Sequence, residues 1–278
     1  MKVIVFGGSG YIGSNIVKLV NADEVAYYSR HKSGELEKSG FKWYEGDILD
    51  EEKVASAVKD YDMVVNASGV WDEKEQKHYD VTVTGTKNVV NAMKKNDTDQ
   101  RLIFISAINV HYGSFEYFRT RRIAEDNVDL YKNHLNVRTS IVYGRGDPLT
   151  DMLVKLSNEK IKLPFGKSLA PVYIDDFVKV IENSGSINGA VYLNSFEKIS
   201  FADMVNMIRE KRGKKPFAIK NRPGGIKKAV EGIDGTGIIS AERVKMLLLD
   251  YYRETSQLNR WVKEPMTYSK YLDEMLKA

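Results

Sequence analysis

The sequence predicts an α/β fold, a doubly wound parallel sheet of the Rossmann type with a small interleaved C-terminal module. Short apolar runs alternate with segments of helical periodicity over the first half of the chain, as in repeated βα units with right-handed crossovers. The first apolar run, 3–6, ends in glycines spaced G-x-x-G-x-x-G. A length of 278 residues suits one large α/β domain, or a domain of about 150 residues with a smaller companion.

The individual elements follow from the pattern of apolar residues. Short buried runs rich in β-branched and aromatic residues predict strands, and apolar residues every three or four positions predict helices. The predicted strands are 3–6, 24–29, 41–44, 62–67, 102–106, 138–143 and 190–193. The predicted helices are 13–20, 51–59, 84–95, 151–158, 175–182, 200–211 and 240–252.

The glycines after the first predicted strand form a candidate phosphate site. Gly7 permits the sharp turn, Gly10 lets the backbone approach a phosphate, and Gly13 lets helix and strand pack closely. Free N–H groups at the helix start, at the positive end of its dipole, favour an anion. We therefore predict a dinucleotide pyrophosphate site, with a tight turn that binds nothing as the alternative. The residues assigned to it are Gly7, Ser9, Gly10, Tyr11, Ile12 and Gly13.

The composition excludes several kinds of chemistry. The chain has no cysteine, which rules out disulfides and thiolate chemistry, and its four histidines are scattered, so no metal site is predicted. A formal net charge of +4 suits a phosphate-bearing ligand but is not a nucleic-acid-binding composition. No apolar run approaches the roughly 18 residues that span a bilayer, and the N-terminus lacks a signal-peptide pattern. We expect a cytoplasmic protein without nucleic-acid or membrane partners.

The regular alternation of strands and helices loosens beyond residue 144. We therefore predict a dinucleotide-binding Rossmann domain over 1–144, to which 171–194 return. The remaining segments, 145–170 and 195–278, are predicted to form the substrate module. No internal repeat or linker separates the two parts, so the second half is expected to interleave with the first.

Seven short motifs together resemble the extended short-chain dehydrogenase/reductase superfamily, the group of nucleotide-sugar epimerases and dehydratases. They are 7–13 (GGSGYIG), 46–48 (GDI), 82–88 (TVTGTKN), 117–125 (YFRTRRIAE), 138–144 (RTSIVYG), 171–176 (PVYIDD) and 261–268 (WVKEPMTY). Each motif alone is unspecific, but their order and spacing together are specific. The resemblance implies a nicotinamide cofactor, a small-molecule substrate that is nucleotide-linked in many relatives, and a homodimer as one option.

The resemblance also implies cofactor contacts beyond the glycine turn. Asp47 and Ile48 are expected to flank the adenine ring. Asn66, Ala67 and Ser68 are expected to line the nicotinamide ribose. A helix-preceding cap is the alternative for Asp47, and a strand-end turn residue is the alternative for Asn66.

The end of the second predicted strand bears on the choice between NAD and NADP. Relatives that prefer NAD usually carry an acidic residue there, which binds the ribose 2′-hydroxyl. This chain has Ser29, Arg30 and Lys32 instead, and a guanidinium suits a 2′-phosphate. NADP is therefore favoured over NAD. The alternative is that Arg30 and Lys32 are solvated loop charges.

The catalytic centre that the resemblance implies is altered in this chain. The superfamily uses a tyrosine as acid/base and a lysine four residues later; here Tyr117 is present and Arg121 replaces the lysine. A unit charge about 6 Å away is worth about 3 kcal/mol at an effective dielectric of 20, so the electrostatic role survives the exchange. The broad planar fork fits ribose hydroxyls less well than an ammonium does. An ordinary buried tyrosine is the alternative for Tyr117.

The hydroxyl that orients the substrate oxygen in the superfamily is displaced as well. Ser106 lies slightly early and is assigned to the catalytic set, with a structural strand-end serine equally open. Asn109 could donate an amide N–H to the substrate oxygen, a contact worth about 3 kcal/mol, or be a plain loop residue. The segment between Tyr112-Gly113 and Tyr117 is shorter than the substrate loop of the related epimerases, which points to an atypical branch.

A basic stretch over 209–228 supplies the last candidate. It holds nine Lys and Arg residues and one acid. Residues 222–225 (RPGG) resemble the R-P-G-D segment with which sugar-nucleotide epimerases hold a pyrophosphate, although Gly225 replaces the acid. Arg222 is therefore a candidate substrate contact, and a solvated charged surface is the alternative.

Three functions stay open at this point. The leading one is an NAD(P)-dependent oxidoreductase or epimerase-type enzyme that acts on a hydroxyl or ketone, with a nucleotide sugar as one option, by reversible hydride transfer. The second is an NAD(P)H-binding protein without turnover, a sensor or accessory subunit like the atypical members. The third is an NADP-dependent reductase of a small carbonyl compound.

Overall fold

The computed structural model of the chain describes residues 1–71, 73, 75–96, 99–112, 114–185 and 187–277. By its internal contacts the chain divides into two compact units. The first unit comprises Met1–Thr139 and Phe177–Tyr192, and the second comprises Ser140–Asp176 and Leu193–Ala278. The predicted limits of a dinucleotide-binding domain and a substrate module stay a prediction about function.

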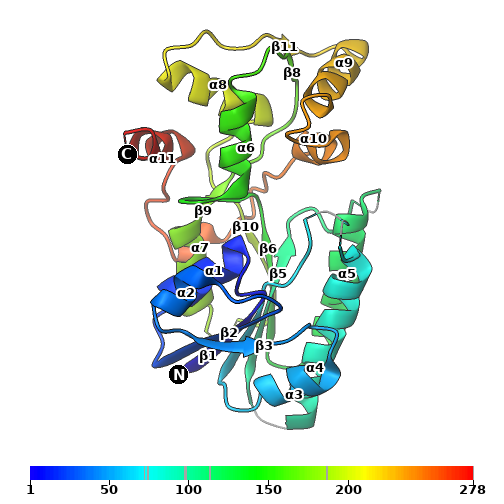
Figure 1. Cartoon of the computed structure of the whole chain (residues 1–278), viewed down its shortest axis with the longest axis vertical. Helices are drawn as coiled ribbons and strands as arrows, with labels where there is room; N and C mark the ends of the chain where they lie inside the picture. Colours follow the sequence, from blue (N-terminus) through cyan, green and yellow to red (C-terminus); the bar gives the residue numbers. More distant parts are fainter. Residues whose placement is uncertain (72, 74, 97–98, 113, 186, 278) are drawn as a thin grey trace. The chain divides into compact units, whose positions relative to one another are not determined.

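A sheet of seven strands, in the order β10-β6-β5-β4-β1-β2-β3, forms the centre of the fold (Figure 1). All pairings from β6 across to β3 are parallel, which confirms the predicted doubly wound sheet. The order reverses at β1, which lies between β4 and β2; ligands of such sheets bind beyond the carboxyl ends of the strands at this point. The strands are β1 (Lys2–Phe6), β2 (Glu24–Ser29), β3 (Lys42–Glu45), β4 (Met63–Asn66), β5 (Arg101–Ala107), β6 (His134–Thr139) and β10 (Gly189–Leu193).

The strands form where the sequence is continuously apolar, because parallel strands are buried on both faces. All side chains from Val3 to Phe6 are completely buried, and every residue of β5 is buried as well. The Phe6 ring packs on the Tyr28 ring of the neighbouring strand, with centroids 4.7 Å apart. This core fixes the carboxyl end of β1, where the glycine turn begins.

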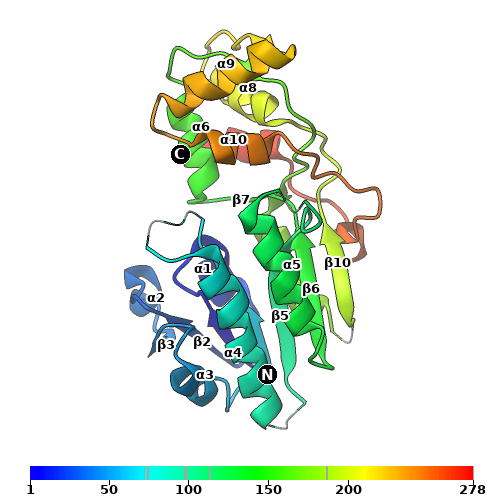
Figure 2. The ribbon, with the colours of Figure 1, turned by 90° about the vertical axis from the view of Figure 1, so that its right-hand side faces the viewer.

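Helices cover both faces of the sheet. Figure 2 shows α4 and α5 over one face, and α1 lies on the opposite face (Figure 1). The helices that pack on the sheet, or lie at its edges, are α1 (Tyr11–Leu19), α2 (Gly34–Lys38), α3 (Glu51–Ala57), the π-helix η1 (Tyr79–Thr84), α4 (Gly85–Asn96), α5 (Glu116–Val128) and α7 (Ile174–Asn183). The sequence analysis missed α2, which Ser33 caps through the N–H of Leu36 at 3.4 Å, and η1.

The second unit combines helices with two small parallel sheets, β7–β9 and β8–β11. Its strands are β7 (Val142–Tyr143), β8 (Leu163–Pro164), β9 (Val172–Tyr173) and β11 (Ile219–Lys220). Its helices are α6 (Pro148–Leu156), α8 (Phe201–Lys211), α9 (Pro223–Asp234), α10 (Ala241–Leu247), the 3-10 helix η2 (Leu258–Arg260) and α11 (Tyr268–Met275).

The predicted strand 138–143 is wrong, because two different strands share it. The chain leaves the main sheet at Ser140, whose N–H donates to the carbonyl of Leu193 at 2.8 Å. The Ser140 hydroxyl also donates to the carbonyl of Leu169. Strand β6 therefore ends at Thr139, and the next strand, β7, pairs with β9 in a separate sheet.

Two predicted helices have different limits in the structure. The predicted helix 151–158 begins earlier, because Asp147 caps α6 by accepting the N–H of Thr150 at 2.6 Å and Pro148 takes the first helical position. The predicted helix 240–252 ends early: α10 stops at Leu247, and the N–H of Tyr251 donates to the carbonyl of Ser168 at 2.7 Å.

A buried ion pair links α5 to β6 in the first unit. The carboxylate of Glu125 is completely buried, and Arg138 donates to it from Nε at 3.0 Å and from Nη2 at 2.7 Å. A third nitrogen of Arg138, Nη1, donates to the Tyr192 hydroxyl at 2.5 Å. Apart from these bonds, the carboxylate has a longer contact with Arg122 at 3.5 Å.

We predict that Arg138→Met lowers the free energy of unfolding by about 3–5 kcal/mol, because the Glu125 carboxylate stays buried with little compensation. The measurement is urea unfolding followed by far-UV circular dichroism. Tyr192→Phe is the matched control, since it removes one bond and should cost about 1 kcal/mol. Similar losses in the two variants would contradict the assignment of the ion pair as the main interaction.

Candidate functional site

The glycine turn between β1 and α1 brings backbone against backbone. Gly7 has a φ of +73°, which favours glycine, and a Cβ there would lie 2.8 Å from the Cα of Ser68. A Cβ on Gly13 would overlap the carbonyl oxygen of Gly7. Gly10 has more room, since its Cβ would lie 3.3 Å from that oxygen. The first and third glycines are therefore required by the packing of the turn itself.

The N-terminus of α1 (Tyr11–Leu19) begins without a side-chain cap. Gly10 is the N-cap, and no side chain in the described part of the chain caps this helix. The first helical bond runs from the N–H of Ser14 to the carbonyl of Gly10 at 2.8 Å. The N–H groups of the first helical turn precede this bond and are not used by the i→i−4 pattern of the helix. With the positive end of the dipole they suit a phosphate, so the turn fits a dinucleotide pyrophosphate.

Ser29, at the end of β2, is held by an indole from the next strand. Its hydroxyl donates to the carbonyl of His31 at 2.8 Å and accepts the Nε1–H of Trp43 at 3.2 Å. The indole also bonds to the carbonyl of Ser29 at 3.3 Å. The Ser29 hydroxyl proton is thus already used in a hydrogen bond within the chain. Its oxygen can accept a further hydrogen bond.

Both cations after β2 have carboxylate partners. Arg30 lies 3.7 Å from a carboxylate oxygen of Glu75, and Lys32 pairs with Glu37 of α2. All four side chains are more than a third exposed, from 38% for Arg30 to 77% for Glu75. Exposed pairs of this kind contribute about 0–1 kcal/mol. An incoming anion can therefore replace these carboxylates at low cost.

Asp47 joins two loops and does not cap a helix. Its carboxylate accepts the N–H of Leu49 at 3.0 Å and the Nε2–H of Gln76 at 2.9 Å. The cap of α3 is Asp50, which accepts the N–H of Lys53 at 3.1 Å. The cap alternative for Asp47 is therefore wrong.

Ile48 and Tyr28 hold the loop that follows β3 in place, one by packing and the other by a hydrogen bond. Ile48 is buried, and a Cβ on Gly85 would press against its side chain. The Tyr28 hydroxyl donates to the carbonyl of Asp47 at 2.8 Å. Burial, and then the negative charges of Asp50 and Asp47, raise the pKa of Tyr28 above its ordinary value. The phenol therefore stays protonated and acts as a donor.

Asn66 forms the turn at the carboxyl end of β4. Its side chain is completely buried; Nδ2 donates to the Thr86 hydroxyl at 3.0 Å, and Oδ1 accepts the N–H of Ser68 at 3.0 Å. Ala67 and Ser68 lie in the turn and are half-buried. The Asn66 side chain thus has the structural bonds of a strand-end turn, and its contact with a ribose stays a prediction.

Tyr117 sits in the first turn of α5 within a cluster of rings. Its ring is half-buried and makes edge-to-face contacts with Trp71, His78 and Phe118, with centroids 6.1, 5.8 and 5.3 Å away. The guanidinium carbon of Arg121 lies 3.8 Å from the ring centroid. This arrangement brings together two of the predicted catalytic residues and places a permanent cation on the face of the phenol ring.

Ser106 and Asn109 are both buried near the carboxyl end of β5. The hydroxyl oxygen of Ser106 is inaccessible and has no hydrogen-bond partner among the described residues, so no structural bond accounts for it. The carbonyl of Asn109 accepts the N–H of Tyr112 at 2.9 Å in the turn after the strand. Gly113, which belongs to the predicted short loop, lies outside the described residues.

Arg222 is the exposed N-cap residue of α9 in the second unit, with Pro223 in the first helical position. The resemblance to a pyrophosphate-binding loop thus falls on the start of a helix that the sequence analysis did not predict. Other members of the basic stretch have roles in packing: Arg209 lies 3.7 Å from the ring centroid of Phe217, and Lys211 pairs with Asp273. A contact between Arg222 and a substrate stays a prediction.

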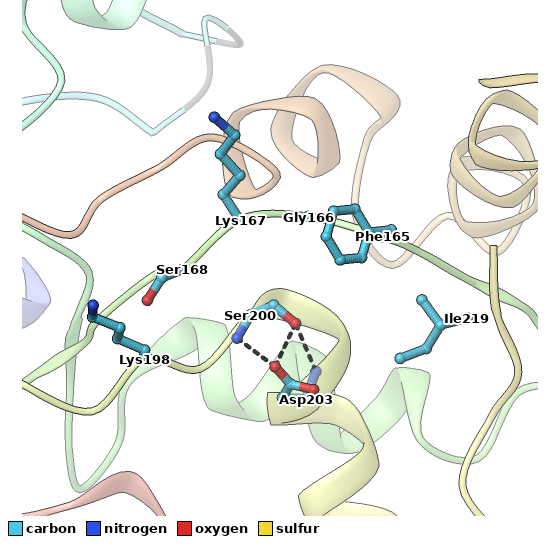
Figure 3. A pocket seen from close by; sticks show the side chains of 8 residues that line it. All are labelled: Phe165, Gly166, Lys167, Ser168, Lys198, Ser200, Asp203 and Ile219. Atoms are coloured by element: carbon cyan, nitrogen blue, oxygen red, sulfur yellow. Dashed lines mark hydrogen bonds between the residues drawn. The ribbon is translucent and has the colours of Figure 1, made fainter. Parts of the chain in front are cut away.

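A cavity of about 300 Å³ lies in the second unit beside the start of α8 (Figure 3). Its wall includes Phe165, Lys167 and Lys198, together with Ser200 and Asp203. The carboxylate of Asp203 accepts the N–H and the hydroxyl of Ser200 at 2.8 and 2.7 Å, as a helix cap. None of the residues predicted for the site lines this cavity.

The sequence analysis missed three side chains that shape the site of the first unit. Trp43 holds Ser29, and Trp71 and His78 pack on Tyr117. A usable signal existed for Trp71, which follows the end of β4 by five residues on a segment expected near the ligand. Among the described helices, none has the length and apolar character needed to cross a membrane. Within the residues that the structure describes, no group of three or more His, Asp or Glu side chains is arranged to hold a metal ion.

Comparison with known proteins identifies the first half of the chain. Residues 7–136 match a family described as NAD(P)H-binding. The chain is 31% identical over 129 residues to a UDP-glucose 4-epimerase of Klebsiella pneumoniae, which covers 40% of this chain and 92% of that protein. It is 27% identical over 179 residues to a 3-beta-hydroxysteroid dehydrogenase of Mycolicibacterium neoaurum, 52% of this chain and 49% of that protein. The chain thus spans about half the length of the latter relative.

The fold is also that of the UDP-glucose 4-epimerase of Thermus thermophilus, solved in complex with NAD. The TM-score is 0.73 at 19% sequence identity, and the match covers 100% of both chains. The segment matched by the NAD(P)H-binding family contains the glycine turn, the end of β2 and Tyr117. The chain therefore belongs to the extended or atypical short-chain dehydrogenase/reductase superfamily, among the NAD-dependent epimerase/dehydratase-like proteins, with an NAD(P)H-binding domain in its first half.

Proposed function

We propose that the protein is an NAD(P)-dependent enzyme that interconverts a hydroxyl and a ketone by reversible hydride transfer, with a nucleotide sugar as its substrate. The observation that carries the proposal is the Tyr117 phenol, with the Arg121 cation over its ring, in the same unit as the glycine turn at the start of α1. The UDP-glucose 4-epimerase relative supports the substrate class. Arg222, exposed in the second unit, is proposed to contact the substrate phosphates.

Each side chain of the site is proposed to have a separate role in such a reaction. A bound nicotinamide dinucleotide supplies the site that accepts or returns the hydride. Tyr117 takes the proton of the substrate hydroxyl as it becomes a ketone, and gives it back in reverse. The Arg121 cation stabilises the negative charge that the phenol then carries. The unpartnered hydroxyl of Ser106 and the side chain of Asn109 are proposed to orient the substrate oxygen.

A nicotinamide-dinucleotide binder without turnover is the second candidate. It is favoured by one feature, the Arg121 guanidinium stacked on the ring face of Tyr117 in place of the lysine of the superfamily. A planar guanidinium donates to ribose hydroxyls in a different geometry from a compact ammonium. The effect of removing the Tyr117 hydroxyl separates the two candidates.

Gly10→Val is predicted to weaken NADP binding at least tenfold without unfolding the protein. The added Cβ lies 3.3 Å from the Gly7 carbonyl oxygen, a tight contact that a shift of a few tenths of an ångström in the turn relieves, and the side chain occupies the approach to the helix N–H groups. Isothermal titration calorimetry gives the dissociation constant. Gly34→Ala is the control, because a Cβ at Gly34 meets nothing within 4 Å. Unchanged affinity in the Gly10 variant would remove the turn from the cofactor site.

We propose that NADP is favoured over NAD, because Arg30 and Lys32 offer charge to a 2′-phosphate and their own carboxylates are exposed. Glu37→Gln is predicted to raise the ratio of NADP to NAD affinity several-fold, since it frees Lys32. The matched control is Glu35→Gln on the same helix, whose carboxylate pairs with Lys18 at 3.0 Å. Titration of both cofactors measures the ratio, and equal changes in the two variants would defeat the assignment.

Tyr117→Phe is predicted to lower kcat by about 10²–10⁴-fold, the usual contribution of a general acid/base. The ring contacts with Trp71, His78 and Arg121 stay, so the fold and cofactor affinity should be preserved. The assay follows the interconversion of UDP-glucose and UDP-galactose, together with cofactor absorbance at 340 nm. Full turnover in this variant would exclude Tyr117 as the acid/base.

A further inference from the structure

Strand β3, at the edge of the main sheet, places two side chains beside the end of β2. In the parallel register of the two strands, Glu45 lies opposite Ser29, the last residue of β2. Opposite residues on neighbouring strands point to the same face of a sheet, and so do residues two apart on one strand. Trp43, Glu45 and Ser29 therefore share one face. The bond from the Trp43 indole to the Ser29 hydroxyl confirms this placement for Trp43.

The hydrogen bonds of Ser29 leave its hydroxyl oxygen ready to accept. A serine hydroxyl has one proton and two lone pairs. The proton is donated to the carbonyl of His31 at 2.8 Å, and one lone pair accepts the Nε1–H of Trp43 at 3.2 Å. The second lone pair accepts only from a group that carries a proton. To donate to a ligand instead, Ser29 has to give up its bond to His31.

Glu45 adds a second group that only accepts. Its side chain is exposed at the end of β3. An ionised carboxylate accepts hydrogen bonds and does not donate them, and it repels another anion. Glu45 thus supplies, from the neighbouring strand, the acidic group that the end of β2 lacks.

The cations beside this face act in the opposite direction. The ammonium of Lys32 lies 5.6 Å from the centroid of the Trp43 ring, and Arg30 follows Ser29 directly. Both cations favour an added phosphate, whereas Ser29 and Glu45 favour a group that donates a proton. The ribose 2′-hydroxyl of NAD is a donor, and an ionised 2′-phosphate of NADP has only acceptors. The two cofactors therefore meet opposed sets of side chains at the same place.

We propose that β3 supplies the side chains that keep NAD as a ligand of this site. Trp43 holds Ser29 as an acceptor, and the Glu45 carboxylate accepts the 2′-hydroxyl of the adenosine ribose. The inference rests on the proposed function, which assigns this ribose to the end of β2. It limits the preference for NADP that Arg30 and Lys32 provide, so both cofactors bind. Trp43 is a positioning residue, because it acts on the ribose through Ser29.

The test is isothermal titration calorimetry of the full chain with NAD and with NADP. The two ligands differ only in the group on the 2′-carbon, so the ratio of their dissociation constants isolates that contact. The wild type should bind both, with a difference of about tenfold or less. Glu45→Gln should shift the ratio toward NADP by about fivefold or more, because it removes a repelling charge and keeps the shape of the side chain. Undetectable NAD binding in the wild type, or an unchanged ratio in Glu45→Gln, would overturn the role of Glu45.

Two further variants test Ser29 and Trp43. Ser29→Ala and Trp43→Phe should each shift the ratio toward NADP by about threefold or more, the effect of one hydrogen bond. Trp43→Phe keeps a ring beside Lys32 but removes the indole N–H, which frees the Ser29 hydroxyl to turn and donate to a phosphate. Ser29→Thr keeps the hydroxyl and should keep the wild-type ratio. A ratio that moves in Ser29→Ala and not in Trp43→Phe would overturn the positioning role of Trp43.

Glu52→Gln and Tyr44→Phe are the matched controls. Glu52 is exposed on α3, and its variant changes the net charge as Glu45→Gln does. Tyr44 lies between Trp43 and Glu45 on β3, and its hydroxyl accepts from that of Tyr61 at 3.2 Å. Both controls should keep the wild-type ratio. An equal shift in Glu52→Gln would mean a long-range charge effect and would overturn the contact.

Failure of the proposed function gives a different result. If neither cofactor binds to the wild type, the proposed function fails and this inference fails with it. If both bind and the ratio stays the same in every variant of Glu45, Ser29 and Trp43, the cofactor site stands and only this inference is overturned.

Discussion

The contact between Gly13 of α1 and the carbonyl of Gly7 is the constraint on which the first unit depends. Because no Cβ intervenes, the helix starts directly against the end of β1, the strand at which the strand order reverses. The loops after β2, β4 and β5 leave the sheet at the same edge. The proposed phosphate site therefore depends first on the backbone of this turn, and the side chains of those loops are proposed to determine which ligand it binds.

The cations of the first unit are of two kinds, and the difference lies in their counter-charges. Arg30 and Lys32 are exposed and have carboxylates of the chain beside them, so their charge is available to a ligand only by exchange. Arg121 is buried and has none among the described residues, so its charge is available without exchange. Arg30 and Lys32 are proposed to adjust the choice between NADP and NAD by small differences in binding free energy. The charge of Arg121 is proposed to act on the Tyr117 phenol and on the substrate group that exchanges a proton with it.

Much of the sheet could be predicted, and the reason is local. β2 has the predicted limits, and β1 and β5 differ by a residue at one or both ends, because buried parallel strands are continuous apolar runs. The glycine turn was also predictable, since its spacing is set by backbone packing. The break at Ser140 was not, because it depends on bonds to Leu193 and Leu169, far away in sequence. The stacking of Arg121 on Tyr117 likewise follows from side-chain placement that spacing alone does not specify.

The hydrogen bond from Trp43 to Ser29 has a consequence for how the molecule can be observed. The chain has three tryptophans. Two of them lie in the first unit, with Trp43 bonded at the end of β2 and Trp71 against the Tyr117 ring. Indole emission shifts in wavelength and intensity with the polarity of its surroundings. The two ends of the proposed cofactor, adenosine and nicotinamide, would thus each have a native spectroscopic reporter, and single-tryptophan variants would resolve their arrival in time.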